Sequence, residues 1–485
     1  MTARTLNRLA HALGGSLLRR TRWRAALGAA LTLLCACSGG ARLPRAEALE
    51  ARLARAGYTV QRGRVAAFAI EDCAPIPNCF GNNASSPYGL WWLPPAPGTL
   101  APVPGEMGLP PDDQGRTAGW TLHADEAVVY VGRTSPEAAY YSFAPYLFSR
   151  VNGDGARVPV FASLADAVNM THFADAPFER EIAVIVTASV ELDAQLRRYL
   201  VATGLAADDI VTFGLAAEQL RFGTELDDDH FMMLQRFALF ADAAAGEAYL
   251  ADIPATLLRV TPQGAASVTS FDVPTRAERA TGDSEGVLSG GLDTLEAAVR
   301  AQHDGSTLTD VRILSASAIS ILLRSEACLA NTSNCLGEIS DTVYSAGPIS
   351  AAGTAADTLV LGDAPGERLV VMGVNHAAFG RATYSNMVVM NSGRLMGVAA
   401  MTDAEMRGSA DAYLGDHPDA QYLYAVSVMR DCGDEPYCVE VPTDFPGVAL
   451  DEPLSLAFRA YVQPGASVSP APRELVVERV VHVLP

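Results

Sequence analysis

One histidine stands where an apolar strand should end, in a position to take a proton from a substrate. His376 lies in the segment VVMGVNHAAFG that begins at Val370, among small neighbours that would leave its ring accessible. Histidine titrates near neutral pH and is the side chain most often used as a general base. The alternative is the commoner arrangement, in which a histidine at a strand end is a hydrogen-bonded part of the structure.

Several side chains that follow His376 could orient it. Asp411, Asp416 and His417 belong to the segment DAYLGDH, while Tyr384 and Ser385 belong to the next strand. No spacing in the sequence fixes any of these contacts. With Asp416 and His417 as its neighbours, His376 would be the general base of an extracytoplasmic hydrolase, which is one of our two functional hypotheses.

A second pattern, GDSEG at 282–286, matches the G-x-S-x-G turn that presents the nucleophile of α/β-hydrolases. That turn needs an apolar strand before it. The residues that precede it here, TRAERAT, are charged and form no such strand. We therefore expect a solvated loop that leads into a helix near Gly290.

A run of three aspartates and a histidine, 227–230, supplies oxygen and nitrogen ligands that suit a divalent cation. Consecutive side chains point in different directions, so we expect an exposed acidic turn and predict no metal site. The sequence also has no phosphate-binding glycine loop, no dinucleotide fingerprint and no CxxCH haem attachment. We accordingly predict no cofactor.

Six of the eight cysteines form three local pairs. A zinc site would usually place its cysteines closer together and in a reducing compartment. In an oxidising compartment, neighbours at this spacing close short loops as disulfides. Turn-forming residues lie between the members of each pair, so we expect pinned surface loops of the kind that shape binding rims. The predicted bonds are Cys73–Cys79, Cys328–Cys335 and Cys432–Cys438.

The N-terminal segment is basic, then apolar, and then carries a cysteine. Residues 1–24 hold six Arg and no acid, and the ten residues that follow, AALGAALTLL, carry no charge. This layout is typical of an export signal, and ten residues are too few to span a bilayer. The next residues, LCACSGG, resemble the lipobox of bacterial lipoproteins, with Leu34 at −3, Ala36 at −1 and Cys37 as the lipidated residue.

The resemblance covers about residues 18–40 and implies cleavage before Cys37, followed by attachment of lipid chains. It predicts a protein of the cell envelope whose membrane partner is reached through that lipid. Ser38 is not the Asp that retains many lipoproteins on the inner membrane. In a Gram-negative host we therefore expect the outer membrane or its periplasmic face. The alternative is a cleaved secretion signal without lipid.

The charge of the chain excludes one class of partner. The formal net charge is −20, and it becomes more negative once the basic signal segment is removed. Such a field repels the phosphates of nucleic acid, so we predict no nucleic-acid binding.

The distribution of apolar residues predicts an α+β fold of mostly antiparallel strands with a few packed helices. One βαβ unit is expected at 181–214, where two apolar strands flank the segment VELDAQLRRYLVATG. The capping box that begins at Thr402 should open one further helix, which Gly415 could close. Aromatic residues on both faces of 138–150 indicate strands that are buried on both sides.

The domain prediction has four parts: a signal segment 1–36, a lipidated N-terminus with a spacer helix 37–57, a mixed part 58–280 and a strand-rich part 287–485. The last two could also form one continuous domain. We found no internal repeat. Pinned loops are plentiful and no catalytic constellation is evident, so our first hypothesis is a module that binds a small ligand or a protein partner.

Overall fold

Strand pairing builds four sheets in the computed structural model, which describes residues 44–99, 109–173, 175–264, 266–349 and 358–485. The predicted signal segment and Cys37 lie outside these residues. No helix within the described ranges is long and apolar enough to cross a membrane. The described residues belong to a single compact unit, Gly40–Pro485.

The first two sheets use the strands of the N-terminal half. The first has the order β1-β11-β4-β8-β9, and the second has the order β2-β3-β10-β5-β6 with β7 beside β5. Their bounds are β1 Tyr58–Arg62, β2 Arg64–Phe68, β3 Tyr88–Trp92, β4 Ala127–Arg133, β5 Ala138–Val151, β6 Arg157–Ser163, β7 Val168–Asn169, β8 Glu181–Thr187, β9 Ile210–Gly214, β10 His230–Phe240 and β11 Ala255–Pro262.

The other two sheets use the strands of the C-terminal half. The third has the order β12-β20-β14-β17-β18 and the fourth has the order β13-β19-β15-β16. Their bounds are β12 Thr307–Val311, β13 Thr342–Gly347, β14 Arg368–Val374, β15 Ser385–Asn391, β16 Met396–Thr402, β17 Leu423–Met429, β18 Cys438–Glu440, β19 Leu454–Tyr461 and β20 Arg479–Leu484.

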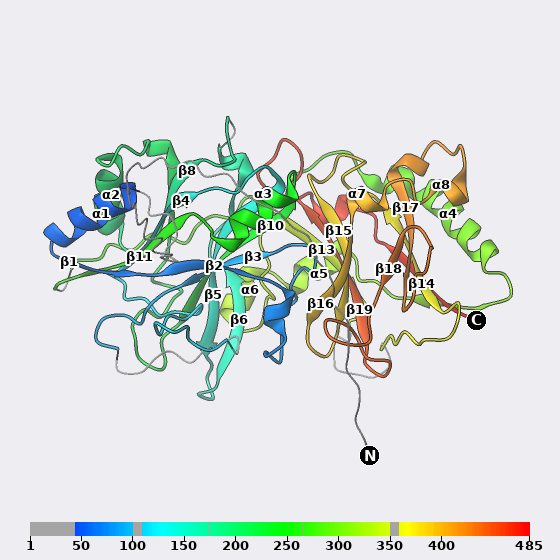
Figure 1. The fold of residues 1–485 in the computed structure, drawn as a ribbon, viewed down its shortest axis with the longest axis horizontal. Helices are drawn as coiled ribbons and strands as arrows, with labels where there is room; N and C mark the ends of the chain where they lie inside the picture. The colour runs from blue at the N-terminus through cyan, green and yellow to red at the C-terminus, as the bar shows by residue number, and fades with distance from the viewer. Residues whose placement is uncertain (1–43, 100–108, 174, 265, 350–357) are drawn as a thin grey trace, which may run out of the picture. The chain divides into compact units, whose positions relative to one another are not determined.

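Eight α-helices are present in the described chain. They are α1 Pro44–Arg55, α2 Val190–Val201, α3 Ala243–Ala251, α4 Ser289–Gln302, α5 Ala316–Leu322, α6 Ser325–Asn331, α7 Asp403–Met406 and α8 Asp411–Leu414. Figure 1 shows the strands of the N-terminal half in blue to green and those of the C-terminal half in yellow-green to red.

The predicted α+β class is confirmed. Every strand pairing in the sheets is antiparallel except β8 with β9 and β17 with β18. The first exception is the predicted βαβ unit, β8-α2-β9, whose helix begins where Ser189 Oγ accepts the Leu192 N–H. All three predicted disulfides are also formed.

The strand order of the first half returns in the second half. In the first sheet, β1-β11-β4-β8-β9, the first strand of the half pairs with its last strand, and the intervening strands follow in chain order. The third sheet, β12-β20-β14-β17-β18, has the same arrangement. Each of the two sheets ends in a parallel pair. The second and fourth sheets match as β3-β10-β5-β6 and β13-β19-β15-β16. The prediction of no internal repeat is therefore wrong, because 58–262 and 307–484 share one topology.

Two disulfide-pinned loops carry the same short sequence and turn. The loop 73–81 ends in NCFG and the loop 328–337 ends in NCLG. In each, the asparagine Oδ1 accepts the backbone N–H two residues later: Asn78 from Phe80 at 2.7 Å and Asn334 from Leu336 at 2.9 Å. An asparagine that bonds its own backbone in this way fixes a turn.

Each of these loops is bonded to the other half of the chain, an arrangement that we call the reciprocal clasp. Gly81 of the first half donates its N–H to the Leu395 carbonyl, which lies between β15 and β16, at 2.7 Å. Gly337 of the second half donates to the Phe161 carbonyl of β6 at 2.9 Å. Both glycines have a positive φ, +74° and +73°, which a side chain would strain. The two halves thus hold each other through equivalent contacts.

Apolar side chains fill the spaces between these sheets in layers. One cluster joins the first sheet to the second, including Trp91, Tyr130 and Val184. The largest cluster joins the second sheet to the fourth and third, with Phe148 and Met387 among its members. Helix α4 covers the outer face of the third sheet. Because the largest cluster draws on both halves, burial as well as hydrogen bonding holds the halves together.

One predicted helix is divided. The capping box at Thr402 is present and opens α7, but α7 ends at Met406 and α8 begins only at Asp411. The break is at Arg407, whose backbone is extended, and at Gly408, whose φ is +83°. Glycine adopts that conformation without a steric cost, so the chain turns there and does not continue as one helix.

Helix α1 corrects the prediction of a spacer. Its buried residues Ala46, Leu49 and Leu53 share a core with α2 and the first sheet, and Figure 1 shows α1 beside α2. Glu50 forms an ion pair with Arg62 of β1. The helix was predicted correctly from its amphipathic pattern, but its apolar stripe is docked on the body.

Leu49→Ala tests whether α1 is part of the folded body. Removing a buried leucine from a packed site should lower the free energy of unfolding by about 2–4 kcal/mol, measured by urea denaturation. The exposed Arg55→Ala on the same helix should change it by less than about 0.5 kcal/mol. Equal, small effects of both substitutions would mean that α1 is a detached spacer after all.

Candidate functional site

His376 lies just beyond β14, as predicted, but its ring is enclosed. The side chain is buried between two carboxylates from distant parts of the chain. His376 Nδ1 lies 2.6 Å from Glu285 Oε1, and Nε2 lies 3.5 Å from Glu478 Oε1. Glu285 also accepts the Val476 N–H at 2.9 Å, and Glu478 accepts the Ser345 hydroxyl at 2.5 Å.

This surrounding fixes the protonation state of His376. Burial alone lowers the pKa of the imidazole, but the charges and hydrogen bonds of Glu285 and Glu478 outweigh it and raise the pKa to about 10. The ring is therefore a cation at neutral pH and has no lone pair with which to accept a proton. The geometry gives the hydrolase hypothesis no support.

The residues that the sequence offered as partners of His376 lie elsewhere. Asp416 is exposed after α8, and His417 Nδ1 accepts the N–H of Asp419 at 3.2 Å. In the described chain the ring is paired with Glu285 and Glu478 instead. The expectation that a cluster with Asp416 and His417 forms around His376 is therefore wrong.

The G-x-S-x-G segment is a solvated loop, as expected, but one of its residues has a role that the pattern did not indicate. Ser284 is exposed, and its Oγ accepts the Gly286 N–H at the start of a short 3-10 helix. The next residue, Glu285, turns inward and becomes the partner of His376. The buried pair therefore connects the loop between the two halves to the end of β14.

Residues of the acidic run at 227–230 also have structural roles, in an ion pair and in a backbone hydrogen bond. Asp229 is fully buried and forms an ion pair with Arg150 at 2.6 Å. Asp228 accepts the Glu225 N–H at 2.8 Å. Within the described ranges, no cluster of three or more His, Cys, Asp or Glu side chains is placed to hold a metal ion.

A polar pocket of about 260 Å³ lies where the segment between the halves crosses β6, α5 and α6, and we call it the Arg276 pocket. Its charged groups are three arginines and three acids, and most of the other lining residues are serines. The lining residues are Ser163, Asp166, Arg276, Ala277, Arg279, Ser320, Arg324, Ser325, Glu326, Glu338, Ser340 and Pro472.

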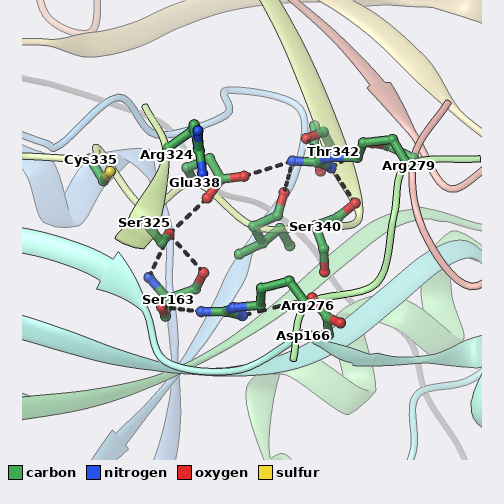
Figure 2. Close-up of polar contacts among 12 residues, drawn as sticks. Ser163, Asp166, Arg276, Arg279, Arg324, Ser325, Cys335, Glu338, Ser340 and Thr342 are labelled. Carbon is green, nitrogen blue, oxygen red and sulfur yellow. Dashed lines mark hydrogen bonds and ion pairs between the residues drawn. The ribbon is translucent and has the colours of Figure 1, made fainter. Parts of the chain in front are cut away.

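The floor of the Arg276 pocket is a chain of hydrogen bonds that begins on β6. Ser163 Oγ lies 2.9 Å from Ser325 Oγ, and Ser325 donates to Glu338 Oε2 at 2.8 Å. Figure 2 shows Ser325 between Ser163 and Glu338. The Cys328–Cys335 disulfide joins α6, which Ser325 opens, to the loop that leads to Glu338. The pinned loop thus lies, along the chain, between two segments that line the pocket, one at Ser325 and one at Glu338.

Arg279 anchors the other side of Glu338. Its guanidinium donates to Glu338 Oε1 at 2.7 Å, to Ser469 Oγ at 2.6 Å and to the carbonyls of Ile339, Ser340 and Thr342. Burial raises the pKa of Glu338, and the Arg279 charge and the Ser325 hydrogen bond oppose that rise. With its donors so occupied, Arg279 holds the pocket in shape and is not available to a ligand.

Arg276 and Arg324 are less fully occupied. Arg276 donates to the Ser163 carbonyl, but its ion pairs with Asp166 and Glu326 are both 3.7 Å long, beyond hydrogen-bond length. Arg324 lies 4.0 Å from Glu326, and its side chain is 66% exposed. These two guanidinium groups can therefore turn towards an acidic ligand in the pocket. Such a ligand could approach them more closely than Asp166 or Glu326 does.

Sequence reasoning missed these residues: it predicted pinned surface loops of the kind that shape binding rims, but it singled out no residue of this pocket. Arg276 and Arg279 sit in a charged stretch that looks like any solvated loop. Their partners Ser163, Glu338 and Ser469 come from distant parts of the chain.

No protein-family model matches the sequence, and no curated protein is similar to it. Among solved structures, the fold is similar to that of an uncharacterized protein from Burkholderia cenocepacia, at 12% identity and a TM-score of 0.37, over 86% of this chain and 81% of that one. The VPA0106 protein from Vibrio parahaemolyticus has 10% identity and a TM-score of 0.37, over 91% and 96% of the two chains. Likenesses this low indicate nothing about the site.

The His376 cation predicts a pH dependence of stability. Because the folded pKa of about 10 lies above the ordinary histidine pKa of 6.5, the stabilisation is complete below pH 6.5 and declines as the pH rises towards 10. The wild type should lose about 3 kcal/mol of unfolding free energy between pH 6 and 9 through this group, and His376→Gln should remove that part of the slope. NMR of the imidazole provides a direct check: a ring that deprotonates near pH 6.5 would contradict the assignment.

Proposed function

We propose that this chain is an exported, lipid-anchored protein of the cell envelope whose body binds a small polar ligand that bears an acidic group. The observation that carries the ligand proposal is the state of Arg276, a partly buried guanidinium whose two carboxylate neighbours lie at 3.7 Å. A ligand carboxylate or phosphate can complete this site with short, charge-assisted hydrogen bonds.

The rest of the Arg276 pocket suits the polar part of such a ligand. Ser320 and Ser340 offer hydroxyl groups, and the apolar lining is limited to Ala277 and Pro472. Few apolar contacts and many hydrogen-bonding groups favour a sugar acid or an amino acid over a lipid or an aromatic molecule. The volume of about 260 Å³ is on the scale of such small metabolites.

Two observations support the proposed location of the protein in the cell envelope. The lipobox around Cys37 is a sequence resemblance, and the three disulfides are bonds that persist in oxidising compartments such as the periplasm. The ligand would then be met at the membrane surface. If the host is Gram-negative, the outer membrane or the periplasmic face is the expected address.

Metabolic labelling with a palmitate analogue tests the anchor. The wild type should incorporate label and partition with membranes, whereas Cys37→Ala should do neither, because the thiol is the attachment point. Cys35→Ala is the matched control and should label normally, since Cys35 would leave with the signal segment. Label that persists in Cys37→Ala would end the lipoprotein proposal.

Isothermal titration calorimetry with glucuronate and L-glutamate tests the ligand proposal. We expect saturable binding of at least one of these acids, weakened by about tenfold or more in Arg276→Met, which corresponds to the loss of about 1.4 kcal/mol. The exposed Arg55→Met, far from the pocket in sequence, should bind as the wild type does. If neither acid binds, or if Arg276→Met binds equally well, the pocket is not the ligand site.

A further inference from the structure

Two arginines are buried in the interior with one amino group each left unpaired. Arg236 of β10 and Arg459 of β19 are both 6% exposed. Nη2 of Arg236 donates to the Gly337 carbonyl at 2.8 Å, and Nη2 of Arg459 donates to the Gly81 carbonyl at 2.9 Å. In both side chains Nη1 is buried and has no hydrogen-bond partner in the described chain. Both guanidinium groups therefore have donors to spare.

No carboxylate in the described ranges forms an ion pair with either group. Aromatic rings give partial compensation: Arg236 lies over Tyr146 at 5.4 Å and Arg459 over Tyr344 at 5.8 Å. A ring face attracts a cation less strongly than an anion does when both are desolvated. Two buried positive charges without a counter-charge are costly, which calls for an anion from outside the chain.

Asp341 is the acid whose charge interacts with Arg236, but it forms no ion pair with it, and one of its two oxygens is bound elsewhere. Its Oδ2 accepts hydrogen bonds from Tyr140 and Asn169, both at 2.9 Å. Burial raises the pKa of Asp341 to about 7, although these hydrogen bonds and the Arg236 charge oppose the rise. A buried carboxyl group whose pKa is raised carries its negative charge less readily, so Asp341 is a weak counter-ion for Arg236.

The two arginines occupy equivalent places in the repeated topology. Strand β10 of the first half corresponds to β19 of the second half, and β3 corresponds to β13. Arg236 is directly opposite Tyr88 on β3, and Arg459 is directly opposite Tyr344 on β13. The carbonyls of Gly337 and Gly81 that bind their Nη2 atoms belong to the reciprocal clasp. Each arginine is thus held by the pinned loop of the other half.

One cavity of about 50 Å³ is lined by the two arginines, Arg236 and Arg459, and by the two tyrosines opposite them, Tyr88 and Tyr344. On the usual allowance of about 10–15 Å³ for each water, it holds roughly four waters or one compact anion. The remaining lining is largely apolar, with the side chains of Phe80, Phe161 and Met232 among it. Water in such a place stabilises a cation poorly, whereas a planar guanidinium can share the oxygens of one anion with its neighbour.

We propose that this cavity is a binding site for one small oxyanion, held between the guanidinium groups of Arg236 and Arg459. The shared chemistry is a carboxylate, sulfate or phosphate group, and the apolar walls favour a carboxylate on a short carbon chain. The chain's charge of −20 repels anions in general, so binding here would depend on these local donors. The site is separate from the Arg276 pocket, which Glu338 lines from the position next to Gly337.

Calorimetric unfolding in buffers that differ only in their anion tests the proposal. Acetate, butyrate, sulfate and phosphate are added separately to the full chain in place of chloride, at constant ionic strength. We expect at least one of them to raise the unfolding temperature in a saturable way. The response should weaken by about 30-fold or more in apparent affinity in Arg236→Met and in Arg459→Met. Butyrate acting at lower concentration than sulfate or phosphate would identify a carboxylate as the ligand.

The controls separate this site from other effects of salt. General stabilisation by sulfate does not saturate and should persist in both variants. The exposed Arg55→Met should keep the full saturable response. Arg276→Met disables the other pocket, so in that background a saturable response should remain and should still be weakened by Arg236→Met or Arg459→Met, which separates this proposal from the ligand proposal above. Should Arg236→Met or Arg459→Met fail to fold, the titration of Arg276→Met, in which the other pocket is disabled, still decides. No saturable response to any of the four anions, or an unchanged response in the folded variants, would overturn the proposal.

Discussion

The two halves of the structure are held together by two disulfide-pinned loops, one from each half, each of which docks on the other half. The loops 73–81 and 328–337 each place a glycine carbonyl under an arginine of the opposite half and a glycine N–H on a hairpin of that half. A disulfide shortens each loop, so little conformational freedom is left to lose when the loop docks. Because the largest apolar cluster also spans both halves, neither half can bury its core alone.

Local patterns predicted what local contacts determine. The apolar periods of 181–214 gave the βαβ unit, the amphipathic stripe gave α1, and the spacing of the cysteines gave all three disulfides. The repeated topology was not predicted, because strand order depends on pairings between segments that are remote in the chain. Its one visible trace was the pair NCFG and NCLG, whose asparagine and glycine are needed for the turn.

The candidate sites could not be predicted in the same way, because their partners are remote in sequence. His376 is 91 residues from Glu285, and no spacing rule links them. The environment of the ring was not predictable either: small neighbours suggested an open ring, yet the ring is buried between Glu285 and Glu478. A stronger signal was present in the strands that carry Arg236 and Arg459, where one charge interrupts an otherwise apolar run. A charge in such a place needs a specific partner, wherever that partner comes from.

If Cys37 carries the lipid proposed above, the docking of α1 limits how far the body can lie from a bilayer. Helix α1 begins at Pro44, seven residues after Cys37. A peptide of seven residues spans at most about 25 Å even when fully extended. With a lipid on Cys37, the body would be kept within roughly the thickness of one bilayer from the headgroups. It would then be confined to a thin layer at the surface, and molecules could reach it only by entering that layer.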